Sequence, residues 1–262
     1  MNTAARKQFL KRNVEGWIFV LPTVVGLLVF RLGPMVASGV LSFTHYEMIT
    51  PPSFVGWQNY KALLDDALFW KSLYNTLYYV GLSLPLREVT ALMIAVLLNQ
   101  KIRGMGIFRT LYYLPSVTAG VAISILWTYV YDPQFGLMNY LLSKLGIDGP
   151  TWLGSPKWAM PALIIMSVWQ IGRPMLIYLA GLQSVPSYLY EVAELDGATI
   201  WHKFRYVTIP LLTPIIFFNL VMGIIGSFQI FTQAYVMTSG GPLNATLVYV
   251  MYLYKVAFQW LQ

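Results

Sequence analysis

Residues 211–237 read LLTPIIFFNLVMGIIGSFQIFTQAYVM, a stretch that contains no Asp, Glu, Lys or Arg. A helix needs about 20 predominantly apolar residues to cross the hydrocarbon core of a bilayer, and this stretch is long enough to do so. The rest of the chain has the same character, since 57% of its 262 residues are hydrophobic and 10% are charged. A soluble domain usually has about 25% charged residues. The composition therefore predicts a membrane protein.

Further apolar runs of similar length occur along the chain. They cover residues 16–41, 73–98, 110–131 and 158–182, and a last run opens near residue 247 and reaches residue 262. We predict an all-α, polytopic transmembrane helical bundle with five full spans and a truncated sixth. It forms a single transmembrane domain over residues 1–262.

Basic residues in the connections predict the orientation of these spans. Nine lie in the N-terminal tail and in the second and fourth connections: Arg6, Lys7, Lys11, Arg12, Lys101, Arg103, Arg109, Lys203 and Arg205. Four lie in the remaining connections: Lys61, Lys71, Lys144 and Lys157. Because Lys and Arg accumulate in cytoplasmic loops, we place the N-terminus in the cytoplasm. This bias explains the net charge of +7 without a nucleic-acid partner.

Several kinds of chemistry are excluded or disfavoured by what the sequence lacks. The chain has no cysteine, and its two histidines, His45 and His202, are far apart. We therefore expect no disulfide, thiolate nucleophile or metal site. No G-x-x-x-x-G-K-[ST] phosphate-binding loop occurs, so any ATP hydrolysis belongs to another subunit. A membrane-embedded enzyme is left without an evident catalytic set.

The connection over residues 183–210, QSVPSYLYEVAELDGATIWHKFRYVTIP, is the most informative segment. Ser187 follows a proline and can cap a first helix. Gly197 ends that helix, because glycine adopts a left-handed conformation without steric cost. Thr199 can cap a second short helix, which stops before Pro210. The pattern predicts a helix-turn-helix on the cytoplasmic face.

The apolar side chains of this segment imply a partner. Leu189, Ala193 and Phe204 have no reason to lie in water, and an exposed apolar surface usually marks a site of protein interaction. The alternative is an amphipathic helix lying on lipid.

Residues 191–214, EVAELDGATIWHKFRYVTIPLLTP, resemble the EAA motif of binding-protein-dependent ABC importer permeases. The matching residues are Glu191, Ala193, Asp196, Gly197, Ala198, Phe204, Pro210 and Pro214, with mild apolar departures at Val192 and Ile209. Three more segments are similar to the sugar-importing branch of that family. They are FVGWQNY at 54–60, the pair Asn75 and Thr76, and SGGPLNAT at 239–246.

The resemblance implies a function and a set of partners. It implies a multi-pass permease subunit in the bacterial inner membrane that imports a carbohydrate and is not itself an enzyme. The partners would be a second homologous permease, two cytoplasmic ATPase subunits that bind ATP and Mg²⁺, and an extracytoplasmic solute-binding protein. The 183–210 loop would dock on the ATPase. The residues implied in this coupling are Glu191, Ala193, Asp196, Gly197, Ala198 and Phe204.

A substrate path is suggested by polar residues in the 211–237 run. At 100° per residue, Asn219, Gly223, Gly226, Ser227, Gln229 and Gln233 fall within an arc of about 160°. Amides such as Asn219, Gln229 and Gln233, with the Ser227 hydroxyl, suit the hydroxyls of a sugar. Small and amide residues also pack membrane helices against each other, so both interpretations stay open.

Charged residues interrupt three of the predicted spans. Arg31 lies in the first, Arg87 and Glu88 in the second, and Arg173 in the fourth. Neighbouring residues on a helix point about 100° apart, so Arg87 and Glu88 should not pair with each other. Each can reach another helix, a cavity or an interface. Intramembrane charges also fit an ion-coupled secondary transporter, which is the alternative function, although such proteins usually contain related halves.

Overall fold

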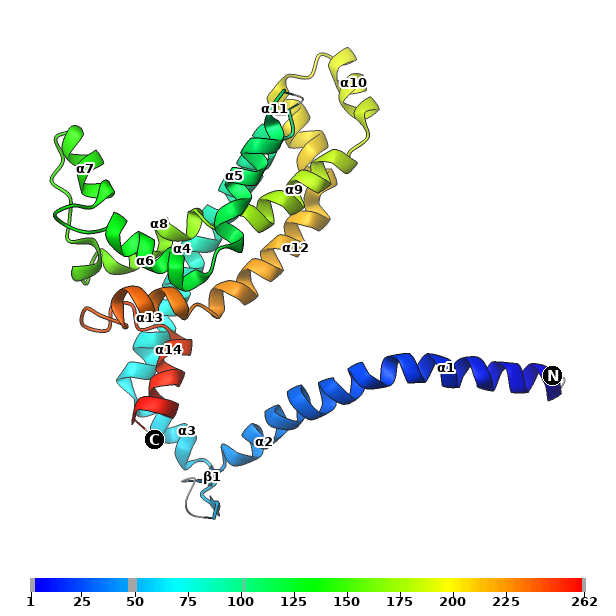
Figure 1. The fold of residues 1–262 in the computed structure, drawn as a ribbon, viewed down its shortest axis with the longest axis vertical. Coiled ribbons are helices and arrows are strands. Elements are labelled where there is room, and N and C mark those ends of the chain that lie inside the picture. Colours follow the sequence, from blue (N-terminus) through cyan, green and yellow to red (C-terminus); the bar gives the residue numbers. More distant parts are fainter. Residues whose placement is uncertain (1–2, 47–50, 101, 261–262) are drawn as a thin grey trace. The chain divides into compact units, whose positions relative to one another are not determined.

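The computed structural model describes residues 3–46, 51–100 and 102–260, with side chains from residue 14 onward (Figure 1). Lys101, Gln262 and the side chains of the N-terminal Arg and Lys residues lie outside the described residues. The chain divides into two compact units, residues 1–67 and 68–262, and each is described by itself. The prediction of one domain over residues 1–262 stays a prediction.

The first unit begins with a long helix. Helix α1 (Thr3–Leu27) passes through a π-helical turn (Leu28–Leu32) into α2 (Gly33–Leu41). In that turn the Gly33 N–H donates to the Leu28 carbonyl, five residues back. The helix therefore continues up to and past Pro34. The most apolar 18-residue stretch within Val14–Leu41 has a mean hydropathy of 1.9, and none of that stretch is buried. The first predicted span is thus present as a helix.

A short hairpin follows this helix. Strands β1 (Thr44–His45) and β2 (Ser53–Phe54) pair antiparallel, and α3 (Gln58–Asp65) comes next. The Asn59 side-chain amide donates 2.9 Å hydrogen bonds to the Ser42 and Thr44 carbonyls. One amide thereby fixes the chain as it leaves α2.

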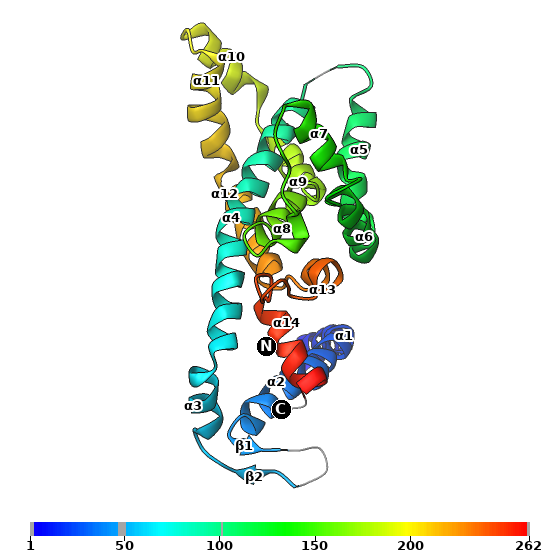
Figure 2. The same ribbon diagram turned by 90° about the vertical axis from the view of Figure 1, so that its left-hand side faces the viewer.

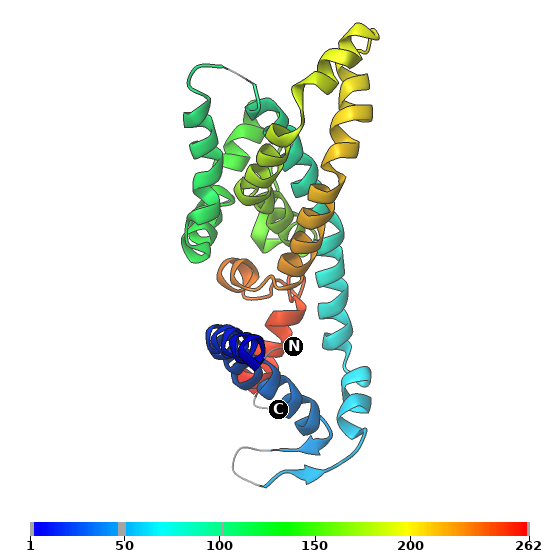
Figure 3. The ribbon, with the colours of Figure 1, turned by 90° about the vertical axis from the view of Figure 1, so that its right-hand side faces the viewer.

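The second unit is built from helices and one 3₁₀ turn. Its elements are α4 (Ala67–Leu98), α5 (Met105–Val117), α6 (Gly120–Val130), α7 (Leu137–Lys144), the 3₁₀ turn Trp152–Gly154, α8 (Ala159–Val168), α9 (Gly172–Ser184), α10 (Ser187–Leu195), α11 (Ile200–Lys203), a π-helical turn (Phe204–Thr208), α12 (Ile209–Phe228), α13 (Thr232–Thr238), α14 (Tyr249–Tyr254) and a final π-helical turn (Lys255–Trp260). Figures 1, 2 and 3 show α10 and α11 at one end of this unit and α14 toward the other. Helix α4 runs between these ends.

Four helices among the described residues are long and apolar enough to cross a membrane. They are Val14–Leu41, Ala67–Leu98, Ala159–Ser184 and Ile200–Phe228. The third predicted span, 110–131, is not one straight helix, because α5 and α6 meet at a bend of 101°. Thr118 and Ala119 are extended there, with ψ of 143° and 131°. The structure thus gives four spans, or five if the bent pair counts as one.

The fifth predicted span, 211–237, has wrong boundaries at both ends. The helix runs from Ile200 to Phe228, so it starts before the predicted segment and ends inside it. Residues 229–231 break the helix, with Phe231 at φ −144° and ψ −60°, and α13 follows separately. The apolar run continues across this break, and hydropathy therefore does not reveal it.

Four helices surround the main apolar core of the second unit. Helix α9 packs against α5 and α12, and residues of α4 complete the cluster. Its fully or nearly fully buried members are Ala91, Ala95 and Leu98 from α4, Met175, Tyr178, Leu179 and Leu182 from α9, Ile171 just before α9, and Leu212 from α12. This core holds together the two helices, α9 and α12, that flank the 185–208 segment.

Candidate coupling site

The first half of the 183–210 loop forms the predicted helix and glycine turn. Helix α10 spans Ser187–Leu195, and Gly197 has a φ of +77°, in the left-handed region. The Gly197 N–H donates to the Glu194 carbonyl at 3.0 Å, and the Ala198 N–H donates to the Ala193 carbonyl at 2.9 Å. These bonds satisfy carbonyls that the helix end leaves free. The predicted role of Gly197 in the turn is therefore confirmed.

The cap at the start of α10 differs from the prediction. Ser187 is the first helical residue, and the cap position belongs to Pro186, which makes no side-chain hydrogen bond to the helix. Pro186 is already extended, with ψ of 129°, so the chain enters the helix without a hydroxyl cap.

The second helix is capped as predicted but does not stop at the proline. The Thr199 Oγ1 accepts the His202 N–H at 3.3 Å and lies 2.7 Å from His202 Nδ1. Helix α11 then continues through the π-helical turn into α12. In this turn the Ile209 N–H donates to the Phe204 carbonyl, five residues back. The extra residue of a π turn offsets the carbonyls that a proline would otherwise meet, so Pro210 lies inside a continuous helix.

Side-chain contacts hold the two halves of the loop together. The Lys203 ammonium forms an ion pair with the Glu194 carboxylate, which links α11 to α10. The Tyr190 hydroxyl lies 3.0 Å from the Thr208 Oγ1. The loop is thus a folded element with its own internal contacts.

The exposed apolar residues of this loop are not those that the sequence singled out. Leu189, Ala193 and Phe204 are half-buried within the loop. The exposed side chains are Tyr188, Val192, Leu195, Ile200, Trp201 and Tyr206. Leu195 is 88% exposed and Trp201 is 68% exposed. We call these six residues the apolar face of the loop. Periodicity did not find them, because the two short helices meet at a turn and share no single helical repeat.

The candidate coupling residues lie close together around the turn. Ala193, Asp196, Gly197 and Ala198 line a hollow of about 350 Å³ that His202, Lys203, Tyr206 and Val207 complete. Glu191 is exposed on α10, and Phe204 packs against the Trp201 ring at 5.7 Å between centroids. The structure therefore brings four of the six residues together.

The candidate substrate-path residues do not form one stripe. Asn219 and Ser227 are buried on α12, whereas Gln229 ends that helix and Gln233 lies on α13. The 160° arc is wrong for Gln229 and Gln233, since it assumed a continuous helix. Asn219 Nδ2 donates to the Pro174 carbonyl of α9 at 3.3 Å, and the Ser227 hydroxyl has no hydrogen-bond partner among the described residues. Asn219 therefore makes a packing contact, and both interpretations of the other residues stay open.

One of the intramembrane charged residues, Glu88, contacts another helix. The Tyr178 hydroxyl of α9 donates to Glu88 Oε2 at 2.6 Å. The neighbouring Arg87 has a buried Nε without a hydrogen-bond partner among the described residues. Arg31 and Arg173 are exposed in their own units. The expectation that Arg87 and Glu88 do not pair with each other stays a prediction.

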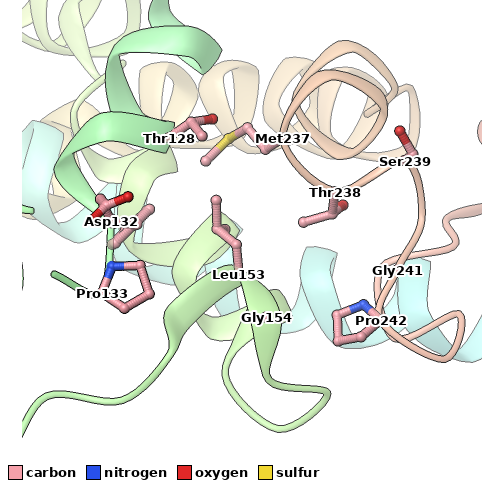
Figure 4. Close-up of a pocket in the computed structure, with 11 residues that line it drawn as sticks. Thr128, Asp132, Pro133, Leu153, Gly154, Met237, Thr238, Ser239, Gly241 and Pro242 are labelled. Carbon is pink, nitrogen blue, oxygen red and sulfur yellow. The ribbon is translucent and has the colours of Figure 1, made fainter.

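A second hollow lies between α6 and α13 (Figure 4). It measures about 560 Å³. In the picture the side chains of Leu153 and Met237 point into it. Asp132 lies at its edge, where Oδ1 accepts the Gln134 and Phe135 N–H groups at 2.9 and 2.8 Å. These two bonds hold the pKa of the Asp132 carboxyl below its ordinary value of 3.8. Sequence reasoning missed this site, which assembles from distant segments.

Comparison with known proteins identifies the family. Residues 69–260 match the model described as "Binding-protein-dependent transport system inner membrane component". The chain belongs to this family. The matched segment includes the whole of the 183–210 loop, so the resemblance carried by residues 191–214 is confirmed.

Curated relatives and solved structures agree with this assignment. The permease is 45% identical to a probable ABC transporter permease protein, YesP, of Bacillus subtilis (strain 168), over 96% of this chain and 83% of that one. It is 38% identical to the lactose transport system permease protein LacF of Rhizobium radiobacter, over 100% of this chain and 89% of that one. A crystal structure of a bacterial ABC transporter involved in alginate import has a TM-score of 0.82 and 26% identity, over 97% of this chain and 88% of that one.

The permease is therefore a transport subunit of an ABC importer rather than an enzyme, as predicted. None of these relatives supports an ion-coupled transporter.

Proposed function

We propose that this permease carries a carbohydrate across the bacterial inner membrane. The relatives named for their substrates support this class, since they include a lactose permease and the trehalose/maltose permease MalF of Thermococcus litoralis, which is 34% identical over 88% of this chain. Ser227, Gln229 and Gln233 offer donors and acceptors to sugar hydroxyls. Two of them, Gln229 and Gln233, flank the break between α12 and α13.

The permease crosses the membrane several times with its N-terminus in the cytoplasm. The charge bias of the connections supports this orientation, and the apolar helices supply the spans. The 183–210 loop then lies on the cytoplasmic side, because it follows the fourth predicted span.

The permease works with partner subunits. It pairs with a second permease, receives its substrate from an extracytoplasmic solute-binding protein, and is driven by two cytoplasmic ATPase subunits that bind ATP and Mg²⁺. A related alginate transporter has been crystallised with a pentasaccharide-bound periplasmic protein. This complex supports the proposal of a solute-binding protein as a partner of this chain.

The apolar face of the loop is the observation that carries the coupling proposal. Leu195, Ile200 and Trp201 are among its most exposed residues. Apolar side chains presented by a folded helix-turn-helix fit a groove on a partner protein. Glu191, Ala193, Asp196, Gly197, Ala198 and Phe204 then contact or support the ATPase docking surface. Closure of the ATPase dimer on ATP would displace this loop together with α9 and α12.

The test compares two glycines with the same local geometry. Gly197 follows α10 at φ +77°, and Gly146 follows α7 at φ +72°, where its N–H donates to the Ser143 carbonyl at 3.0 Å. Proline cannot adopt a positive φ and has no N–H, so Gly197→Pro and Gly146→Pro disturb equivalent turns.

We expect Gly197→Pro to insert normally, to lose co-purification of the ATPase and to lose sugar uptake. Gly146→Pro should retain the ATPase. Uptake that persists in Gly197→Pro without any bound ATPase would overturn the proposed coupling.

A further inference from the structure

Asn75 of α4 bridges two carbonyl groups of a segment far along the chain. Its Nδ2 donates to the Asn244 carbonyl and to the Leu247 carbonyl, each at 2.9 Å. The Asn75 side chain is 4% exposed. Buried amide groups are costly unless they are hydrogen-bonded, and here both amide hydrogens are used on one segment.

The next residue, Thr76, contacts the same segment. Its hydroxyl donates to the Ser72 carbonyl at 2.8 Å and accepts the Tyr249 N–H at 2.8 Å. Tyr249 is the first residue of α14, whose own cap residue, Val248, provides no side-chain cap. A residue of α4 therefore satisfies one of the free N–H groups of α14.

The segment held in this way has a strained and exposed tip. Leu243 and Asn244 have φ of +50° and +57°, in the left-handed region that residues with a Cβ rarely adopt. The Leu243 side chain is 85% exposed. Such backbone persists only where surrounding contacts impose it. The contacts are those from Asn75, together with the Thr238–Thr246 hydroxyl pair at 2.6 Å and the bond from Thr246 to the Gly241 carbonyl.

The other half of α4 is tied to the helices beside the coupling loop. Glu88 accepts the Tyr178 hydroxyl of α9, and Ala91, Ala95 and Leu98 pack in the core shared with α9 and α12. Residues 67–98 form one helix through Pro85. One helix thus contacts both the α9–α12 pair and the 239–249 segment (Figure 2).

We propose that Asn75 and Thr76 are positioning residues of the transport cycle, through which a displacement of the α9–α12 pair reaches the 239–249 segment along α4. This inference rests on the proposed coupling of the 183–210 loop to an ATPase. It adds that the conformation of the 239–249 segment follows α4, and not only its chain neighbours α13 and α14.

The absence of cysteine from the chain allows a direct test. In the assembled transporter with cysteine-free partner subunits in proteoliposomes, Leu243→Cys carries a single nitroxide label. Its spectrum is recorded at rest and after trapping with ATP and vanadate. The background is then changed to Asn75→Asp, which keeps the side-chain shape but sets a carboxylate against two carbonyl oxygens.

Asn59→Asp is the matched control, because Asn59 also bridges two carbonyls at 2.9 Å but does not lie on α4. Thr76→Val, which keeps the shape and removes the hydroxyl, is the second variant if Asn75→Asp fails to assemble.

We expect the spectral change on trapping to be largely lost in Asn75→Asp and to persist in Asn59→Asp. If Asn75 had a purely structural role, Asn75→Asp would lower the amount of assembled complex but would not change the spectral difference between the resting and trapped states of each complex. An unchanged difference in Asn75→Asp, or in Thr76→Val, would overturn the proposal.

The wild-type background separates this proposal from the function on which it rests. If the label does not respond to trapping while uptake still requires ATP, the proposal fails and the proposed function stands. If uptake does not require the ATPase at all, both fail.

Discussion

The Tyr178 hydroxyl donates a 2.6 Å hydrogen bond to Glu88 Oε2, and this bond joins α9 to α4 beside the main core. Hydrogen bonds between membrane helices contribute about 0.6 kcal/mol on average and up to about 1.7 kcal/mol. Because Tyr178→Phe leaves a carboxylate oxygen without its donor, we expect a loss near the upper end of that range. The loss of stability is measured by unfolding each variant in detergent with increasing amounts of SDS.

Tyr74→Phe is the control for this prediction, since Tyr74 is an exposed tyrosine of α4. Equal stability of the two variants would show that the bond contributes nothing.

Gly172 allows α9 to approach α5 closely. A Cβ added at Gly172 would lie 2.7 Å from the Tyr112 carbonyl oxygen and 2.8 Å from the Tyr113 Cα. Since backbone atoms cannot move aside cheaply, we expect Gly172→Ala to destabilise the permease by about 1–3 kcal/mol. In the same assay Gly106→Ala should instead stabilise the permease. Nothing lies within 4 Å of a Cβ added at that position, and alanine favours a helix more than glycine does.

The Asp132 carboxylate makes the 132–135 turn sensitive to acid. Its pKa is lowered by hydrogen bonds from the Phe135 and Gln134 N–H groups. A lowered folded pKa means that the stabilisation is present above the unfolded value and is lost as the pH falls through the folded value. We expect the turn to loosen only below pH 3.8. Carboxyl NMR titration of the labelled residue should show a midpoint below that value, and a midpoint at or above it would contradict the prediction.

The apolar face of the loop should govern ATPase binding without governing stability. Leu195 and Trp201 make few contacts within the chain because they are largely exposed. We therefore expect Leu195→Ser with Trp201→Ser to weaken ATPase co-purification about tenfold or more, as for truncated interface hot spots, and to change the unfolding midpoint little. Phe135→Ser, at an 89% exposed position outside the loop, should leave ATPase binding unchanged. Loss of binding in that variant as well would point to a general effect.

Local signals predicted the coupling turn better than the membrane helices. Gly197 and Thr199 act within a few residues of themselves, so their conformations followed from sequence. The break at 229–231 and the bend at Thr118 leave hydropathy unchanged and could not be seen in an apolar run. Pro210 was misleading for the reverse reason, because a local helix-breaking rule was overridden by the π turn before it.

Long-range contacts were beyond sequence reasoning altogether. The pair Asn75 and Thr76 was recognised only as part of a resemblance, and its partners in the 239–249 segment lie more than 160 residues away. Only a fold that brings α4 and α14 together reveals what these two side chains do.

The π turn at Phe204–Thr208 also constrains the length of the chain. An α-helix advances about 100° per residue, and a π turn holds one residue more than the α-helical turn it replaces. Deleting one residue there would let the turn relax into regular helix and keep the angular phase of α12 relative to α11. Deleting one residue of α12 before Asn219 would instead rotate the side chains that follow, including Asn219 and Ser227, by about 100°. Without that extra residue, however, the Pro210 ring would meet the carbonyls that the π turn moves aside. The proline therefore fixes the length of the turn that precedes it.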